Sequence, residues 1–585
     1  MQVTQKKSAW FAYILTCCML GALVLIPPAC AADNLGRSFT KLRTQHELTV
    51  GFIGGSITSG AGASKASTCY RALICRWLRA QYPTAKFNFI NAAIGGTPSN
   101  LGAYRATHDL AGADLVFVEF AVNDDSRTDA DILSTGEGLI RHLYAMNPKI
   151  DLVVLATIDV KMYGFPYTDS KKPAAVADWM QLAAHYTLDG VNSVPFIDVG
   201  YEVWKLAAPT AAWSTYINWD GYHPVDAGHA VYAKTVTAVL SEHANDQALP
   251  AFTKLPAPLS PNPPLHGAIV DSSQLTLGKA WSYGTSWTPL IYGKSSVSNT
   301  AGAQIDYTFS NSPQVGIYYD CPRVEHNGIT TGTFDLWLDA GPKVHIYNGP
   351  NAGGKNVTNT TFDITLAGKT FTVYSGGGVN PNPENYEWGY FFRLLDVPQD
   401  GKAHTLHLQL TAGTLGVFGL LNNSATVPAP LPLAVMKGVY PACWSDYSKD
   451  LTEFNDCFAT DGVAIVLRKS SDALVFNNVD GGKKAATARL QVHYCWLAPV
   501  KINVLVNGNR IGDGPVSLPA TNKCEAYFGS DALAFGKCDP RDVAHVYQDY
   551  TMAIPLQSGV NTIKISPDSD NDTIVIDRIT VTSAQ

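Results

Sequence analysis

The stretch Leu48-Thr-Val-Gly-Phe-Ile-Gly-Gly-Ser-Ile-Thr58 joins a short apolar run to a turn of small residues. The run from Leu48 to Ile53 has the length and composition of a buried strand. A turn of small residues at the end of such a strand leaves the backbone accessible and exposes the hydroxyl of Ser56. The motif alone is ambiguous, because a serine in this place can also cap the helix that follows.

The chain around this stretch alternates strands and helices between about residues 45 and 248. Further strands are predicted at 87–94, 114–122, 152–158 and 194–199, and helices at 70–78, 133–146 and 227–243. Continuous apolar strands that alternate with helices indicate a parallel sheet covered on both faces, a three-layer α/β sandwich. Such sheets bind ligands at the carboxyl ends of their strands, where Ser56 is expected to lie.

Three further motifs fall at predicted strand ends or helix starts of the same sheet. Asn91-Ala-Ala-Ile-Gly-Gly-Thr97 follows the second strand, Phe120-Ala-Val-Asn-Asp124 follows the third, and Asp220-Gly-Tyr-His223 opens the last helix. With the Ser56 turn they resemble the SGNH/GDSL hydrolase family, in which four blocks contribute Ser, Gly, Asn and His in this order. Gly55 departs from the family name, which implies Asp at that position.

This resemblance implies the chemistry of a serine hydrolase. Ser56 would be the nucleophile, His223 the base that removes its proton, and Asp220 the carboxylate that holds the imidazole. The backbone N–H groups of Ser56 and Gly96 and the side-chain amide of Asn123 would form the oxyanion hole.

Other interpretations remain open at several of these positions. Asn123 also fits a turn, Asp220 also fits a helix cap, and Gly95 is the alternative to Gly96. Three other histidines are expected to be core or surface residues: His108, His185 and His229. Three carboxylates near the third motif are expected to be solvated or capping: Glu119, Asp124 and Asp125. Since no His, Cys and carboxylate set has zinc spacing, neither a catalytic metal nor a required cofactor is expected.

Residues 1–32 have the pattern of a signal peptide. Lys6-Lys7 precede the apolar run 10–26, and Ala29-Cys30-Ala31 resembles a small-x-small cleavage site. We therefore expect a secreted protein, extracellular or periplasmic, that is not attached to a membrane after cleavage. A membrane anchor is the alternative, although the run is short and Pro27-Pro28 ends it. The 42 Lys and Arg residues face 49 Asp and Glu residues without a basic run, which argues against nucleic acid as a partner.

Cleavage would leave eight of the eleven cysteines, an even number that suits an oxidised, exported protein. Local disulfide bonds are predicted between Cys443 and Cys457 and between Cys524 and Cys538. Cys69 and Cys75 could be joined only if the helix begins after Cys69, because six helical residues rise about 9 Å, beyond the Cα limit for a disulfide.

Two Pro-rich stretches divide the rest of the chain, and short strands between turn residues predict two all-β sandwiches. The predicted organisation is a signal peptide at 1–32, a catalytic domain at 33–248, an extended, semi-rigid linker at 249–267, an accessory β-sandwich at 268–426, a linker at 427–437 and a last β-sandwich at 438–585.

The last segment resembles jelly-roll carbohydrate-binding modules. The stretches that carry the resemblance are 488–494, Val504-Leu-Val-Asn-Gly508, 576–581 and Leu556-Gln-Ser-Gly-Val-Asn-Thr-Ile-Lys-Ile565. Candidate aromatic residues for stacking on sugar rings are Trp444, Tyr447 and Trp496. Three aspartates in one loop could hold a structural Ca²⁺, with a polar turn as the alternative: Asp568, Asp570 and Asp572.

Taken together, the sequence predicts an exported serine esterase that removes acetyl or other short acyl groups from a polysaccharide. The carbohydrate substrate rests on the domain organisation and is an inference by association. A lipase, phospholipase or thioesterase is the first alternative. A non-catalytic surface protein that binds glycans is the second.

Overall fold

The computed structural model describes the chain between residues 33 and 583, with gaps. The residues outside the described part are 1–32, 126, 161–171, 189–190, 261–262, 276, 286–293, 321–332, 348–359, 367–368, 376–391, 425–437, 448–450, 456–462, 522–546 and 584–585. The predicted signal peptide therefore lies outside the described residues. Among the helices that are described, none is both long and apolar enough to cross a membrane.

Five parallel strands form the sheet that carries the Ser56 turn, in the order β2-β1-β3-β4-β7. Their bounds are Glu47–Gly54 for β1, Lys86–Ala93 for β2, Leu115–Glu119 for β3, Asp151–Ala156 for β4 and Phe196–Asp198 for β7. Strands β3 and β4 are buried along their whole length, as continuous apolar strands are in a sheet covered on both faces. The predicted α/β fold with a parallel sheet is confirmed.

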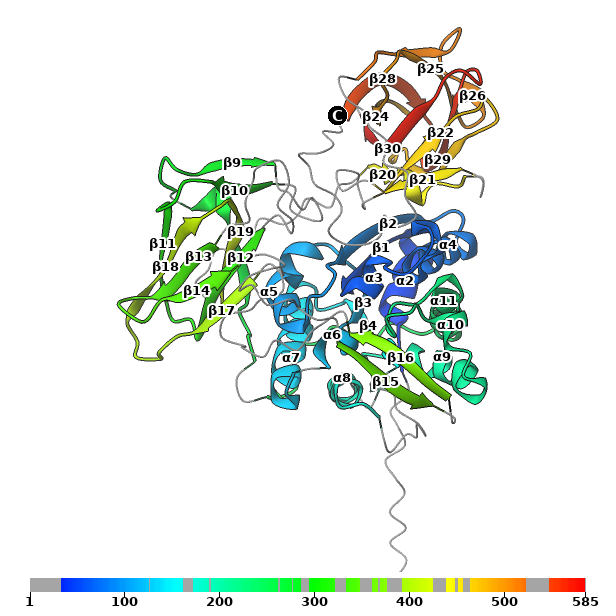
Figure 1. Cartoon of the computed structure of the whole chain (residues 1–585). Helices are drawn as coiled ribbons and strands as arrows, with labels where there is room; N and C mark the ends of the chain where they lie inside the picture. Colours follow the sequence, from blue (N-terminus) through cyan, green and yellow to red (C-terminus); the bar gives the residue numbers. More distant parts are fainter. Residues whose placement is uncertain are drawn as a thin grey trace, which may run out of the picture.

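Helices cover both faces of this sheet. They are α2 (Gly36–Gln45), α3 (Ser56–Ser59), α4 (Tyr70–Gln81), α5 (Ser99–Asp109), α6 (Ala121–Asp124), α7 (Asp129–Met146), α8 (Ala174–His185), α9 (Val199–Ala207), α10 (Trp213–Tyr216) and α11 (Asp226–Glu242). Figure 1 shows α5 and α7 on one side of the sheet and α4 and α11 on the other. Smaller elements of this part are the 3-10 turns η1 (Ala66–Thr68) and η3 (Ala208–Thr210) and the paired strands β5 (Thr187–Leu188) and β6 (Val191–Asn192).

Two predicted boundaries were wrong. The strand expected to reach Val122 ends at Glu119, because Phe120 leaves the extended conformation with a ψ of −3° and α6 follows. The apolar pattern continues through this turn and so does not mark it. The motif expected to open the last helix precedes it, because residues 217–224 form a loop closed by the Asn218 N–H and the His223 carbonyl, 2.7 Å apart.

The middle part of the chain is antiparallel. Its strands are β8 (Ala268–Asp271), β9 (Ser282–Thr285), β10 (Lys294–Ser298), β11 (Gln304–Ser310), β12 (Gln314–Asp320), β13 (Thr333–Leu338), β14 (Val344–Tyr347), β15 (Thr360–Leu366), β16 (Lys369–Ser375), β17 (Phe392–Asp396), β18 (Ala403–Ala412) and β19 (Leu415–Asn422), with a 3-10 turn η4 (Ser272–Gln274). One sheet has the order β17-β12-β19-β10-β9, with β8 also paired to β19, and a second has the order β11-β18-β13-β14. Their apolar faces share one core, which makes a β-sandwich.

The last part of the chain is a second antiparallel sandwich. Its strands are β20 (Val439–Pro441), β21 (Thr452–Asn455), β22 (Val463–Leu467), β23 (Leu474–Asp480), β24 (Ala486–Cys495), β25 (Val500–Val506), β26 (Asn509–Arg510), β27 (Val516–Leu518), β28 (Gln548–Leu556), β29 (Val560–Pro567) and β30 (Ile574–Ser583), with a 3-10 turn η5 (Ala442–Trp444). The two sheets have the orders β21-β22-β30-β24-β28 and β23-β29-β25-β26. This sandwich meets the edge strand β2 through an ion pair between Lys86 and Asp480.

The Pro-rich segment between the first two parts is attached to helices of the α/β part. Glu137 of α7 is completely buried and accepts the N–H groups of Leu259 at 2.9 Å and Ser260 at 2.8 Å. His185 of α8 lies 2.8 Å from the carbonyl of Ala257. Prolines hold the segment extended, and these contacts fix its course over the protein.

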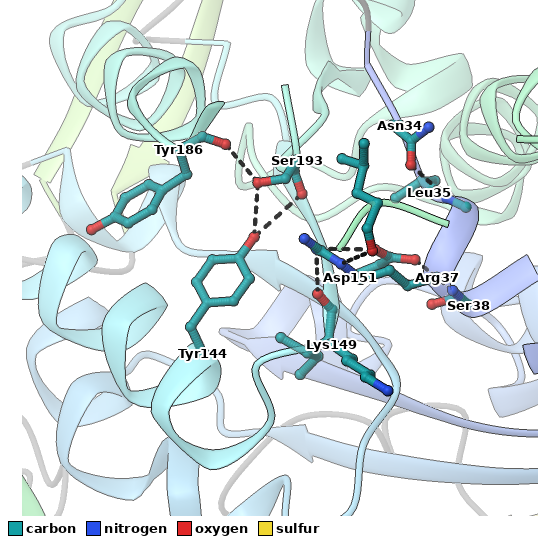
Figure 2. Close-up of polar contacts among 12 residues, drawn as sticks. Asn34, Leu35, Arg37, Ser38, Tyr144, Lys149, Asp151, Tyr186 and Ser193 are labelled. Atoms are coloured by element: carbon teal, nitrogen blue, oxygen red, sulfur yellow. Dashed lines mark hydrogen bonds and ion pairs between the residues drawn. The ribbon is translucent and has the colours of Figure 1, made fainter. Parts of the chain in front are cut away.

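Helix α2 is joined to the amino end of β4 by a buried ion pair (Figure 2). Arg37 Nη1 lies 3.6 Å from Asp151 Oδ1, and the two side chains are 4% and 1% exposed. The same guanidinium donates to three backbone carbonyls, two of them in the segment 249–250. Burial raises the pKa of Asp151 to about 6, although the N–H of Ser38 and the charge of Arg37 act in the opposite direction.

Replacing Arg37 tests this ion pair. Arg37→Met should destabilise the α/β part by about 3–5 kcal/mol, because it leaves a buried carboxylate without its partner. An acid whose pKa is raised by folding loses stability as the pH rises through that pKa, so the loss should be larger at pH 8 than at pH 5. Calorimetry of the full chain at both pH values measures the shift of the unfolding transition.

Lys41→Met is the matched control on the same helix. Lys41 pairs with Asp114 at 2.7 Å, but its side chain is 28% exposed, so its loss should cost less than about 1 kcal/mol. Equal shifts for the two variants, or an Arg37 effect that does not change with pH, would contradict the prediction.

Candidate active site

Ser56 lies at the carboxyl end of β1 and begins the one-turn helix α3. Two glycines precede it, and neither has room for a side chain. A Cβ on Gly54 would lie 2.5 Å from the carbonyl oxygen of Glu119, and one on Gly55 would lie 1.8 Å from Oδ1 of Asn123. The Gly55 that departs from the family name therefore makes room here for the amide of Asn123.

Asp220 and His223 lie in the closed loop between α10 and α11. Oδ1 of Asp220 accepts the backbone N–H of Tyr222 at 3.1 Å and that of His223 at 3.0 Å. The N–H of Gly221 donates to the carbonyl of Asn218, which tightens the loop further. These hydrogen bonds fix the carboxylate and the imidazole relative to each other before any substrate is present.

A chain of two hydrogen bonds connects the three predicted catalytic side chains. Nδ1 of His223 lies 2.7 Å from Oδ2 of Asp220, and Nε2 lies 2.7 Å from Oγ of Ser56. A carboxylate can only accept, so Nδ1 carries the proton and Nε2 is left to accept the serine hydroxyl. The side chain of His223 is 20% exposed and that of Asp220 is 9% exposed. This arrangement can remove a proton from Ser56 while its imidazole remains partly open to solvent.

The two other predicted oxyanion-hole residues are on the segments that follow β2 and β3. Gly96 has a φ of +71°, a conformation that favours glycine, within a turn closed by the N–H and hydroxyl of Thr97 on the Ile94 carbonyl. Asn123 lies on α6, and its amide abuts Gly55 beside Ser56. The structure thus brings Asn123 to the Ser56 turn, and it places Gly96 in the turn that follows the adjacent strand β2, which ends at Ala93.

Glu119, expected to be solvated or capping, is buried behind the Ser56 turn. It is 1% exposed, and its carboxyl accepts the hydroxyls of Thr58 at 2.9 Å and Thr157 at 2.8 Å. The hydroxyl of Thr58 also lies 2.7 Å from that of Tyr70. Burial raises the pKa of Glu119, while these hydrogen bonds and one from the backbone of Gly55 lower it. The carboxyl group therefore contacts the Ser56 turn on both sides of the serine, at Gly55 and at Thr58.

Asp124 is also buried rather than solvated, at 0% exposure. Its Oδ1 accepts the N–H of Ser99 at 3.0 Å at the start of α5, and its Oδ2 accepts the indole N–H of Trp179 at 3.0 Å. Burial raises the pKa of Asp124, against the charge of Arg127. Since Asn123 is the preceding residue and α5 follows the Gly96 turn, Asp124 links the two segments that carry these candidate donors.

The predicted sugar-stacking residues lie in the last sandwich. Tyr447 and Trp496 are half-buried and pack against its core, and the side chain of Trp444 lies outside the described part. Trp496 is further fixed by hydrogen bonds between its backbone and Thr521. A role of these residues in sugar binding stays a prediction.

The three aspartates of the predicted calcium loop bind different partners. Asp570 and Asp572 each accept a backbone N–H at 2.8 Å, from Ser470 and Lys501, and Asp568 accepts the side-chain amide of Asn503 at 3.2 Å. Within the described ranges, no group of three or more His, Cys, Asp or Glu could hold a metal ion. The calcium site stays a prediction.

Of the predicted disulfide partners, three lie outside the described residues: Cys457, Cys524 and Cys538. Both pairings therefore stay predictions. Helix α4 begins at Tyr70, directly after Cys69. The condition on the helix start that a bond between Cys69 and Cys75 requires is therefore met.

The comparisons with known proteins agree with the predicted resemblance. Residues 52–231 match the GDSL-like lipase/acylhydrolase family. Among solved structures, a two-domain esterase active on acetylated mannans, co-crystallised with mannopentaose, is 21% identical, with a TM-score of 0.49 over 68% of this chain and 98% of that chain. A family 35 carbohydrate-binding module from Clostridium thermocellum is 15% identical, with a TM-score of 0.20 over 25% of this chain and 97% of that chain. No match was found among curated proteins.

The family match begins within β1, just before the Ser56 turn, and extends past His223 into α11. Residues 52–231 are therefore a domain of the GDSL-like lipase/acylhydrolase family, and the α/β part of the chain is an acyl-ester hydrolase domain.

Proposed function

We propose that this protein is a serine esterase that removes O-acetyl or similarly short acyl groups from a polysaccharide outside the cytoplasm. The hydrogen-bonded chain from Asp220 through His223 to Ser56, with both distances at 2.7 Å, carries the proposal. Neutral serine is a weak nucleophile, and an oriented imidazole within hydrogen-bond reach is what activates it.

In the proposed reaction, Oγ of Ser56 attacks the acyl carbon while Nε2 of His223 takes the hydroxyl proton. Asp220 keeps the imidazole oriented and stabilises its charged form. The carbonyl oxygen becomes an oxyanion, to which the N–H groups of Ser56 and Gly96 and the amide of Asn123 donate. The intermediate then expels the sugar oxygen, which takes the proton from Nε2. Water, activated by the same imidazole, releases the acid and restores Ser56.

The polysaccharide part of the proposal rests on the sequence. Residues 1–32 have the features of an export signal, and the stretches in 488–581 resemble carbohydrate-binding modules. An exported hydrolase with attached β-sandwiches suits a large, insoluble or polymeric substrate, which the accessory parts would hold near the hydrolase domain. Acetylated polysaccharide or oligosaccharide is the proposed partner.

A lipase, phospholipase or thioesterase shares the same acyl transfer and differs in the acyl group and the leaving group. A preference for long-chain esters over acetate would select this alternative. A non-catalytic glycan-binding protein would bind acetylated glycan without releasing acetate, and its Ser56 would fail to react with a fluorophosphonate probe.

Replacing the candidate nucleophile tests the proposed function. Ser56→Ala should lower acetate release from 4-nitrophenyl acetate, acetylated glucomannan and acetylated xylan by at least about 10³-fold, because no hydroxyl remains to form the acyl-enzyme. Initial rates on these substrates and on a series of 4-nitrophenyl esters of increasing chain length measure the effect. Ser59→Ala, on the same helical turn, is the control and should keep most of the activity. Undiminished release by Ser56→Ala would reject the proposal.

Asp124→Asn tests the link between the candidate oxyanion donors. Asparagine has only one acceptor oxygen, so its NH2 group would face either the Ser99 N–H or the Trp179 indole N–H, both of which the carboxylate accepts. This repulsion should shift Asn123 and the Gly96 turn. We expect kcat on 4-nitrophenyl acetate to fall about 10–10²-fold with little change in KM, less than the full loss of one donor. Asp125→Asn, at the exposed neighbouring position, is the control. Similar kinetics for the two variants, with unchanged unfolding temperatures, would show that Asp124 does not position these groups.

A further inference from the structure

Trp219 is unusually exposed for a tryptophan. Its exposed fraction is 64%, the highest among the large hydrophobic residues that the structure describes. By contrast, Trp179, Trp213 and Trp281 are 1%, 6% and 8% exposed. Leaving so large an apolar ring in water forgoes the stabilisation that its burial would give. Most of the indole is therefore accessible to a ligand.

The place of Trp219 in the fold suggests that role. It directly precedes Asp220 in the loop 217–224, and consecutive Cα atoms lie about 3.8 Å apart. The same loop carries His223, whose Nε2 reaches Ser56. The ring of Tyr222, in the same loop, lies 4.5 Å from the imidazole between centroids, so an aromatic side chain flanks His223.

The backbone under Trp219 is held firmly. Its own N–H donates to Oδ1 of Asn218 at 2.9 Å, and the Asn218 N–H donates to the carbonyl of His223 at 2.7 Å. The carbonyl of Gly221 accepts the N–H of Val160 at 2.9 Å, which ties the loop to the segment after β4. The backbone of Trp219 therefore keeps a fixed position relative to that of His223 and loses little freedom when a ligand binds.

We propose that Trp219 is a specificity-determining residue whose indole stacks on the sugar ring that bears, or adjoins, the ester. This inference rests on the proposed function and names its substrate class at the site, a pyranose-containing polysaccharide. A pyranose ring presents a flat face of C–H groups, which an indole face covers while the hydroxyls at its edge stay in water. A long acyl chain needs instead a concave apolar site that surrounds it. A ring that is 64% exposed is mostly open to solvent and does not form the side of such a pocket.

The test compares substrates with and without sugar rings in the full-length protein. The measured quantity is kcat/KM for acetylated glucomannan and xylan oligosaccharides divided by kcat/KM for 4-nitrophenyl acetate. Trp219→Ala should lower this ratio about ten-fold, mainly through a higher KM for the oligosaccharides, since one aromatic stacking contact has this magnitude. Trp219→Phe should recover most of the ratio because it restores a flat ring.

Leu206→Ala is the matched control, because Leu206 is a 48% exposed apolar residue on α9 of the same α/β part. It should leave the ratio unchanged. Equal losses of Trp219→Ala on both kinds of substrate would indicate a purely structural role and overturn the inference. A larger loss on 4-nitrophenyl decanoate than on the oligosaccharides would assign Trp219 to the acyl group and overturn it as well.

The wild-type protein separates this inference from the proposed function. If it releases acetate from the oligosaccharides and Trp219→Ala does so equally well, the inference fails and the proposed function stands. If the wild type cleaves 4-nitrophenyl acetate but none of the acetylated glycans, the proposed substrate fails, and the inference fails with it.

Discussion

The hydrogen bond from Ser56 to His223 joins residues 167 positions apart, so the site depends on whatever holds these two segments together. Asp226, the first residue of α11, accepts the N–H and hydroxyl of Ser64 and the hydroxyl of Thr68, which follow the Ser56 turn. Burial raises the pKa of Asp226, but these hydrogen bonds outweigh it and hold the pKa below its usual value. Asp226 thus holds the start of α11, and with it the loop that carries His223, close to the segment that follows Ser56. The hydrogen bonds involved favour the charged form of the Asp226 carboxylate.

Two buried carboxyl groups form a second layer beneath the site. Burying a carboxyl group costs free energy unless donors satisfy it, and apolar residues of similar volume are often as stable. Glu119 and Asp124 both have donors on neighbouring elements, so each fixes the relative position of two segments. Ionisable groups with perturbed pKa values gather at functional sites. Their position next to the Ser56 turn and Asn123 agrees with a positioning role rather than a contribution to stability alone.

Periodicity predicted the parallel sheet because its strands are continuous apolar runs, and the four motifs then placed Ser56, Asn123 and His223 at one edge. Periodicity could not show that Phe120 turns out of the sheet, because the apolar pattern continues beyond it. The sequence does indicate that Glu119 is buried, because this ionisable residue stands at the end of a fully apolar strand. Nothing local distinguishes the exposed Trp219 from a core tryptophan, because exposure depends on the whole fold.

The middle sandwich packs directly against the helix behind the Gly96 turn. Ile94 and Tyr104 of the α/β part share a buried apolar cluster with Phe418 and other residues of the middle sandwich, and the Tyr104 hydroxyl donates to Gln314 at 3.1 Å. Figure 1 shows this sandwich beside α5. Separating the two parts would expose that cluster to water two residues away from Gly96. The middle sandwich therefore covers apolar side chains of the segment that carries one of the candidate oxyanion donors.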